Sequence, residues 1–223
     1  REAVEKTISE FEEREGCEVD VVYAGCGTLV SKMQTGEQGL PDLFVTCDAT
    51  YLTKAQLAMG NPFGPDLKVS STRIVMLVAK GNPKDLHALS DLDQEGLRIG
   101  TTDPNASTLG ALSHELIRET GKFDSIKENI EMMADTAHTL IQTMEAGEKL
   151  DVVLVYEANI QHLNERFLAV PLQAERAIAV QNVAARKDTP YPQLTERLML
   201  RLVSDTSRRR FEQLGFSWVA ESE

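Results

Sequence analysis

The sequence predicts an α/β protein with two lobes, each a doubly wound sheet covered by helices, joined by two crossing strands. Short apolar runs alternate with amphipathic segments, the pattern of parallel sheets with helices on both faces. Two longer apolar runs, 72–79 and 177–185, stand where the chain could leave one lobe and return. The length of 223 residues suffices for two small lobes. The predicted boundaries are 1–71 and 178–223 for lobe one, 72–177 for lobe two, and hinges near 70–73 and 175–179.

Lobe one is expected to begin with a helix over 2–14, because Val4, Ile8 and Phe11 form one apolar stripe. Gly16 ends this helix. The apolar run Val19 to Tyr23 predicts a short buried strand. The remaining elements expected before the first crossing strand are a helix over 28–34, a strand over 41–46, a helix capped by Asp48 and a loop over 61–65.

Lobe two repeats the alternation of strands and helices. Leu97–Gly100 and Asp151–Val155 are expected strands, and 107–119 is an expected helix with Leu109, Leu112 and Leu116 turned inward. A second helix is capped by Asp135 or Thr136. After the returning strand 177–185, two amphipathic helices are expected to complete lobe one.

The amino-acid composition argues against several classes of function. The net charge of −12, from 23 basic and 35 acidic residues, argues against a nucleic-acid partner. No apolar run approaches the length needed to span a membrane, and no signal peptide stands at the start. The three cysteines show no zinc-type spacing, so no metal site is expected.

Four short segments are expected at strand ends or helix starts, where backbone N–H groups and the helix dipole favour anions. All offer N–H or O–H donors, and none contributes a lysine or arginine. Uncharged donors suit a small, desolvated oxyanion held by many hydrogen bonds. A cleft closing between the lobes would bring these segments together. Their candidate ligand-binding residues are Gly25, Cys26, Gly27, Ser107, Thr108, Leu109, Thr136, Ala137 and Tyr156.

Each candidate also has a purely structural interpretation. Ser107 and Thr108 are common helix caps, and Tyr156 fits a core residue whose hydroxyl reaches water. His138 fits a surface residue, because a cation at a helix start opposes the dipole. Cys47 fits a small buried apolar residue.

Several motifs occur in an order that resembles one family. They include Tyr23-Ala24-Gly25-Cys26-Gly27-Thr28-Leu29, Pro41-Asp42-Leu43-Phe44, Lys80-Gly81-Asn82-Pro83, Gly100-Thr101-Thr102-Asp103-Pro104 and Val155-Tyr156. Over essentially its whole length the sequence is similar to the periplasmic molybdate/tungstate-binding proteins, solute receptors of ABC importers with the type II periplasmic-binding fold.

The resemblance implies an extracytoplasmic, monomeric binding protein that closes on a molybdate-like oxyanion, needs no cofactor and delivers the ligand to an importer permease. By position, the family's donors fall on Cys26, the backbones of Leu109 and Ala137, and the Tyr156 hydroxyl. The sequence departs from the family twice. Cys26 stands where a serine is usual, and the family's first strand, which precedes the segment matching residue 1, is absent from this sequence.

Two other functions remain open from the residues alone. One is an enzyme with Cys26 as nucleophile, activated at a helix N-terminus, with His138 as base. The other is a ligand-sensing or partner-binding module, because a fold does not determine a function.

The implied strand order also bears on the cysteines. If the missing first strand separates the strands that carry Cys26 and Cys47, the two backbones lie about 9–10 Å apart. That distance exceeds the ~7 Å limit for a disulfide. Cys26 is therefore expected to be an unbridged thiol of depressed pKa, and Cys47 to react slowly.

Overall fold

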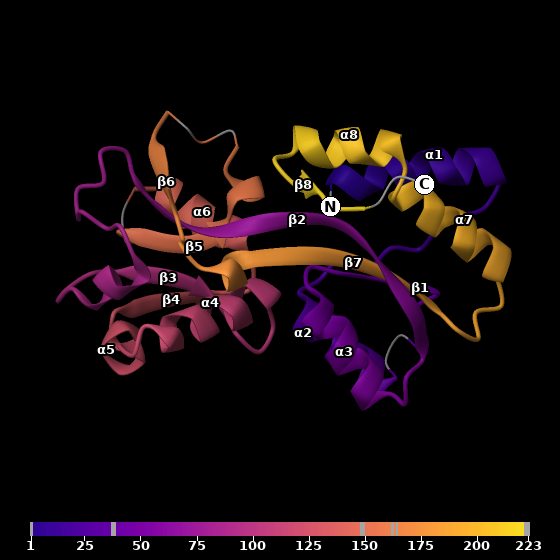
Figure 1. Cartoon of the computed structure of the whole chain (residues 1–223), viewed down its shortest axis with the longest axis horizontal. Helices are drawn as coiled ribbons and strands as arrows, with labels where there is room; N and C mark the ends of the chain where they lie inside the picture. The colour runs from indigo at the N-terminus through magenta and orange to yellow at the C-terminus, as the bar shows by residue number, and fades with distance from the viewer. Residues whose placement is uncertain (1, 37–38, 148–149, 162, 164, 221–223) are drawn as a thin grey trace. The chain divides into compact units, whose positions relative to one another are not determined.

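The computed structural model describes residues 2–36, 39–147, 150–161, 163 and 165–220. The chain divides into two compact units. Unit 1 comprises Arg1–Ser71 and Val180–Glu223, and unit 2 comprises Thr72–Ala179. The chain passes from one unit to the other within two long strands, β2 (Phe63–Ala79) and β7 (Ile178–Arg186), which Figure 1 shows in magenta and orange.

Unit 1 is built from elements near both ends of the sequence. Besides parts of β2 and β7, it contains α1 (Glu2–Glu15), α2 (Cys26–Thr35), β1 (Leu43–Thr46), α3 (Ala49–Ala58), α7 (Pro192–Leu202), α8 (Asp205–Gln213) and β8 (Ser217–Trp218). Strand β1 pairs antiparallel with β7, so that Thr46 lies opposite Asn182, and β8 pairs antiparallel with β2.

Two layers of helices cover the unit 1 strands, with α2 and α3 on one face and α1, α7 and α8 on the other (Figure 1). Neighbouring residues of β7 serve opposite faces, as strand geometry requires. Ala184 packs with the α2–α3 cluster, whereas Val183 packs with the cluster that contains Phe11 and Leu202.

The expected strand over 19–23 is not formed. These residues belong to no helix or strand, and Val21, Val22 and Tyr23 are 42–48% exposed. An apolar run becomes a buried strand only where a neighbouring strand pairs with its backbone, and none of the described residues does so here. The prediction of a buried strand is therefore wrong for this segment.

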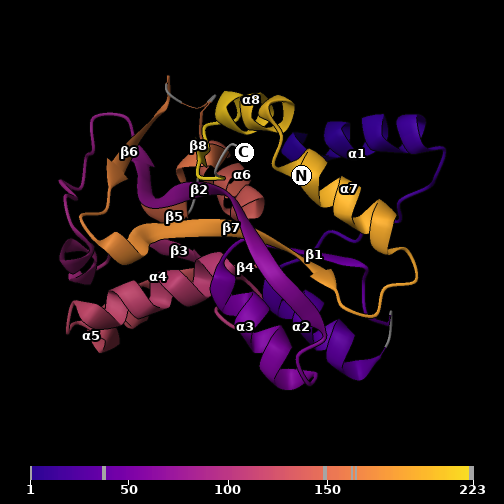
Figure 2. The ribbon, with the colours of Figure 1, turned by 45° about the vertical axis from the view of Figure 1, so that its right-hand side comes forward.

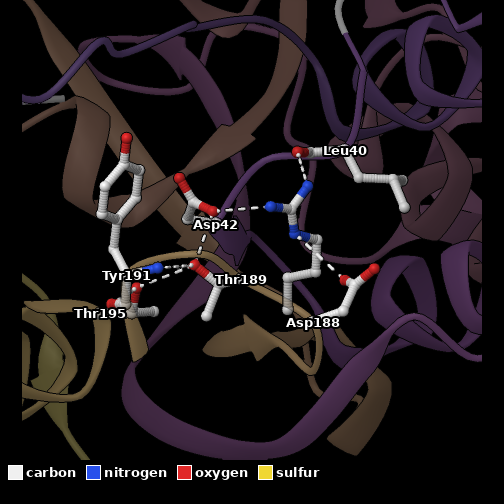
Figure 3. Close-up of polar contacts among 7 residues, drawn as sticks. Leu40, Asp42, Asp188, Thr189, Tyr191 and Thr195 are labelled. Atoms are coloured by element: carbon white, nitrogen blue, oxygen red, sulfur yellow. Dashed lines mark hydrogen bonds and ion pairs between the residues drawn. The ribbon is translucent and has the colours of Figure 1, made fainter. Parts of the chain in front are cut away.

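Strand β1 is only four residues long and is held at its amino end by a polar network within unit 1 (Figure 3). The Arg186 guanidinium contacts the Asp42 carboxylate at 3.0 Å and the Leu40 carbonyl at 2.9 Å. Thr189 donates to the same carboxylate at 2.7 Å and accepts from the Tyr191 N–H. This network ties β1, the end of β7 and the start of α7 together, and leaves the carboxyl end of β1 for other contacts.

Unit 2 is continuous in sequence. It contains the rest of β2, then η1 (Leu89–Asp93), β3 (Ile99–Thr102), α4 (Thr108–Glu119), α5 (Phe123–Glu128), β4 (Ile130–Ala134), α6 (Ala137–Glu145), β5 (Val152–Tyr156), η2 (Glu157–Asn159), β6 (Phe167–Pro171), η3 (Glu175–Ala177) and the start of β7. Strand β3 pairs in parallel with β4 on one side and β5 on the other, and β2 pairs antiparallel with β5 and β6.

Both faces of the unit 2 sheet are buried, as its nearly continuous apolar strands predict. Ile74 and Met76 of β2 face the core under α4, whereas Val75 and Leu77 face the core under α6. Figures 1 and 2 show α4 and α5 together on one face of this sheet, and α6 on the other. The expected doubly wound α/β arrangement is present in this unit, although α5, β4 and β6 were not among the predicted elements.

Among the described residues, no helix is both long and apolar enough to span a bilayer.

A buried histidine of α4, His114, makes the stability of unit 2 depend on pH. His114 Nε2 lies 3.4 Å from Thr101 Oγ1 in the interior. Burial, and then the positive charge of Arg118, lower the pKa of His114 below its ordinary value of 6.5.

We therefore predict that the free energy of unfolding decreases as pH falls below about 6.5. The reason is that His114 binds a proton in the unfolded chain at a pH at which it stays neutral in the folded protein. His114→Gln should flatten this acid limb in denaturant titrations between pH 7 and 5. His87→Gln, which alters an exposed histidine, is the control. Equal acid limbs in wild type and His114→Gln would contradict the assignment.

Candidate anion-binding site

The sequence-predicted donors of unit 2 gather at one edge of its sheet. Because β3, β4 and β5 run parallel, their carboxyl ends meet at the same edge. Helix α4 starts after β3, α6 starts after β4, and Tyr156 ends β5. The Asp103 N–H donates to the Ala134 carbonyl at 3.0 Å and joins the first two of these turns. The structure therefore brings Ser107, Thr108, Leu109, Thr136, Ala137 and Tyr156 to a common edge.

The start of α4 has the local chemistry of an anion site. Ser107 caps the helix with extended backbone angles, and its side chain makes no capping hydrogen bond but accepts from Thr102 at 3.1 Å. The N–H groups of Thr108 and Leu109 precede the first intrahelical bond, which the Ala111 N–H makes to the Ser107 carbonyl. Thr108 is 3% exposed, and its hydroxyl has no hydrogen-bond partner among the described residues.

An unpartnered buried hydroxyl costs free energy, and native proteins rarely retain one without a reason. The Thr108 hydroxyl lies in the first turn of α4, beside N–H groups that favour a negative charge. The capping role that the sequence also allowed for Thr108 is not what the structure shows, because Ser107 occupies the cap position. A bound anion would satisfy the hydroxyl and the N–H groups together.

The start of α6 and the end of β5 supply further donors. The Thr136 hydroxyl accepts from the Thr139 N–H at 3.3 Å, so this side chain acts as a helix cap. Backbone N–H groups at Ala137 and His138 therefore remain as donors from this turn. The His138 side chain is exposed, as expected for a surface residue. The Tyr156 hydroxyl is buried at the end of β5.

In unit 1, the helix that follows the glycine turn begins at Cys26, two residues earlier than predicted. Gly25 caps α2, and Cys26 and Gly27 are buried in its first turn. The Cys47 N–H donates to Cys26 Sγ at 3.3 Å, so Cys26 contacts the residue that follows β1. The expected separation by two strand spacings is therefore wrong, because the two residues are in contact and no strand formed by the described residues lies between them. The buried Cys26 sulfur is also poorly placed as an accessible nucleophile.

Polar side chains at the carboxyl end of β1 were missed in the sequence. Gln181 accepts from Ser70 at 2.8 Å and donates to the Cys47 carbonyl at 3.2 Å. Asn182 donates to Asp66, and the Thr46 hydroxyl, on a residue 1% exposed, has no partner in the described part of the chain. The available signal was the pair Gln181-Asn182, two amides inside an otherwise apolar strand.

No group of three or more histidine, cysteine, aspartate or glutamate residues suited to a metal ion occurs within the described ranges.

Comparisons with known proteins identify the family to which this chain belongs. A family model described as bacterial extracellular solute-binding protein matches residues 1–217. A putative binding protein of Haemophilus influenzae is 23% identical over 220 residues, 97% of this chain and 86% of that protein. The molybdate-binding protein ModA of Mycobacterium tuberculosis is 23% identical over 207 residues, 91% of this chain and 74% of ModA.

Solved structures agree on the fold. The periplasmic molybdate-binding protein of Azotobacter vinelandii superposes with a TM-score of 0.72 at 16% identity, covering 99% of this chain and 95% of that one. A periplasmic thiamin-binding protein superposes with a TM-score of 0.77 at 15% identity, covering 98% and 79%. The fold is therefore that of the type II periplasmic-binding proteins, as predicted.

The close approach of α4 to β3 generates a prediction about Gly110. A Cβ atom at this position would lie 2.3 Å from the Thr102 carbonyl oxygen and 2.6 Å from Asp103. Gly110→Ala should therefore push the start of α4 off the sheet edge and destabilise the protein by about 1–3 kcal/mol. Denaturant unfolding measures the change.

Gly64→Ala is the matched control, because a Cβ there meets only the Ala185 carbonyl oxygen at an ordinary 3.6 Å. Its free energy of unfolding should stay within about 0.5 kcal/mol of wild type. Equal effects of the two substitutions would show that α4 does not depend on the contact at Gly110.

Proposed function

The chain belongs to the family of bacterial extracellular solute-binding proteins, and from this membership we propose that it binds a small tetrahedral oxyanion of the molybdate type. It then delivers the anion, outside the cytoplasm, to the permease of an ABC importer. The protein performs no chemistry on its ligand. The resemblance to ModA supports the oxyanion, and the donor set at the carboxyl edge of unit 2 carries the proposal.

The buried hydroxyl of Thr108 at the start of α4, which has no partner in the described part of the chain, is the observation that favours an anion most directly. Two helix starts, α4 and α6, supply N–H groups at this edge, and Tyr156 supplies a phenolic O–H. None of these donors is charged, so they hold an anion through hydrogen bonds and helix dipoles. In unit 1, the start of α2 has no side-chain cap, so its N–H groups are also proposed as oxyanion donors.

The thiamin-binding neighbour shows that this fold accepts a very different kind of ligand. The donor chemistry distinguishes the two cases. A cationic ligand such as thiamin would gain nothing from helix N-termini, whose partial charge is positive, or from N–H groups, which cannot accept hydrogen bonds. The residues of this edge therefore support an oxyanion over an organic cation.

A thermal-shift screen tests the proposal with molybdate, tungstate, sulfate, phosphate, small carboxylates and thiamin. A ligand at one hundred times its Kd stabilises the folded state by about 2.7 kcal/mol. We expect stabilisation by at least one tetrahedral oxyanion and none by thiamin. Stabilisation by thiamin alone, or by no anion in the screen, would refute the oxyanion assignment.

Tyr156→Phe should weaken binding of the best oxyanion by about 1–3 kcal/mol, because it removes one hydrogen bond to a charged group. Titration calorimetry measures the affinity. Tyr191→Phe is the matched control, since Tyr191 is 57% exposed on the α7 side of unit 1. If Tyr156→Phe binds as tightly as wild type, its hydroxyl is not part of the site.

Thr108→Val separates a ligand-binding role from a structural one. The variant keeps the shape of the side chain and removes a hydroxyl that has no partner among the described residues. We expect the ligand-free protein to be as stable as wild type or up to about 1 kcal/mol more stable, since an unsatisfied buried group is removed. Its oxyanion affinity should nevertheless fall at least about tenfold.

Loss of stability in Thr108→Val without loss of affinity would show that the hydroxyl supports the fold and does not contact the ligand. Both quantities are obtained from the same preparation by denaturant unfolding and calorimetry.

A further inference from the structure

Cys26 and Cys47 form a close pair of thiols in unit 1. Cys26 is the first residue of α2, and Cys47 follows the last residue of β1. The Cys47 N–H donates to Cys26 Sγ at 3.3 Å. Neither sulfur is disulfide-bonded in the structure. A disulfide requires the two Cα atoms to lie within about 7 Å, and the contact between the Cys26 sulfur and the Cys47 backbone is consistent with such a distance.

We propose that Cys26 and Cys47 are a reversible dithiol–disulfide pair, and that closing the disulfide between β1 and the first turn of α2 weakens oxyanion binding. The first part stands on the geometry of the two thiols. The second part rests on the proposed function, because it assigns the start of α2 to the ligand. A disulfide has no S–H donor, and bridging draws the first turn of α2 toward β1.

The exposure of the two residues sets the order of the steps. Cys47 is the exposed member of the pair and Cys26 the buried one, so a small disulfide reagent RSSR reaches Cys47 first. The Cys47 thiolate attacks one sulfur of RSSR and releases RS⁻, leaving a mixed disulfide. The Cys26 thiolate then attacks the Cys47 sulfur and releases the second RS⁻. The two thiols lose two protons and two electrons, and RSSR is reduced to two RSH.

The pH dependence follows from the first step. The pKa of the Cys47 thiol is raised well above its ordinary value, chiefly because the Cys26 side chain hydrogen-bonds to it, with desolvation and charge repulsion from Cys26 acting in the same direction. The side chains beside this thiol also include the Asp48 carboxylate, which raises the pKa further. Little Cys47 thiolate is present at neutral pH, so oxidation should accelerate about tenfold per pH unit as pH rises.

Cys17 provides an internal control. It packs against the α1–α7–α8 face of unit 1, whereas Cys26 packs under α2 and α3. A bridge between Cys26 and Cys47 should therefore leave Cys17 reduced, and Cys17→Ser should oxidise as wild type does.

The test begins with reduced full-length chain incubated with glutathione disulfide at pH 7, 8 and 9, quenched with an alkylating reagent and mapped by mass spectrometry. We expect a loss of about 2 Da from two hydrogens, one cross-linked peptide containing Cys26 and Cys47, and alkylated Cys17. Cys26→Ser should stop at a glutathione adduct on Cys47. Wild-type protein that carries only glutathione adducts, or bridges through Cys17, would overturn the pair.

The second measurement compares molybdate affinity of the reduced and oxidised forms by calorimetry. We expect the disulfide to lower affinity at least about tenfold, and dithiothreitol to restore it. A mapped disulfide with unchanged molybdate affinity would overturn the link between the thiols and the ligand. If the reduced protein binds no oxyanion in the screen, the proposed function fails, and the mass mapping still decides whether the dithiol pair exists.

Discussion

The proposed anion-binding edge of unit 2 depends on how closely α4 starts against the end of β3. Only a residue without a Cβ fits at position 110, because the Thr102 carbonyl occupies that space. This contact fixes the first turn of α4 beside the turn that follows β4, to which the Asp103 N–H is bonded. It also places the buried Thr108 hydroxyl in the first turn of α4, where it has no partner among the described residues. The position of this helix start and the burial of the Thr108 hydroxyl thus follow from one steric restriction.

The two units present related chemistry in different forms. In unit 2 the donors near the sheet edge are hydroxyl and N–H groups, whereas in unit 1 the corresponding helix start carries a thiol in contact with a second thiol. Both sets are uncharged in their protonated state, so the overall charge of −12 does not decide whether an anion binds. Distant surface charges are screened within about 8–10 Å in physiological salt, while the proposed donors would contact the ligand directly.

Sequence patterns predicted those features that each segment determines by itself. Strands such as Val152–Tyr156, buried on both faces, and the helix starts at Thr108 and Ala137 lie within two residues of their predicted positions. The features that were wrong depend on partners elsewhere in the chain. The apolar run over 19–23 could not reveal that no strand among the described residues pairs with this segment. The Cys26–Cys47 contact depends on the order of the strands in space, which the residues around each cysteine do not determine. The buried Thr46 hydroxyl could not be recognised for the same reason.

The discontinuity of unit 1 has a consequence for the order of folding. Unit 2 is one uninterrupted stretch with its own two-sided core, so its contacts can form as soon as residues 72–179 have been synthesised. The pairing of Thr46 with Asn182 joins distant parts of the chain, which makes closing the unit 1 sheet slow and late. During that interval a nascent chain exposes the carboxyl end of β1, with Cys47 beside it, before its partner strand exists. The carboxyl end of β1 is therefore the last part of unit 1 to reach its folded form.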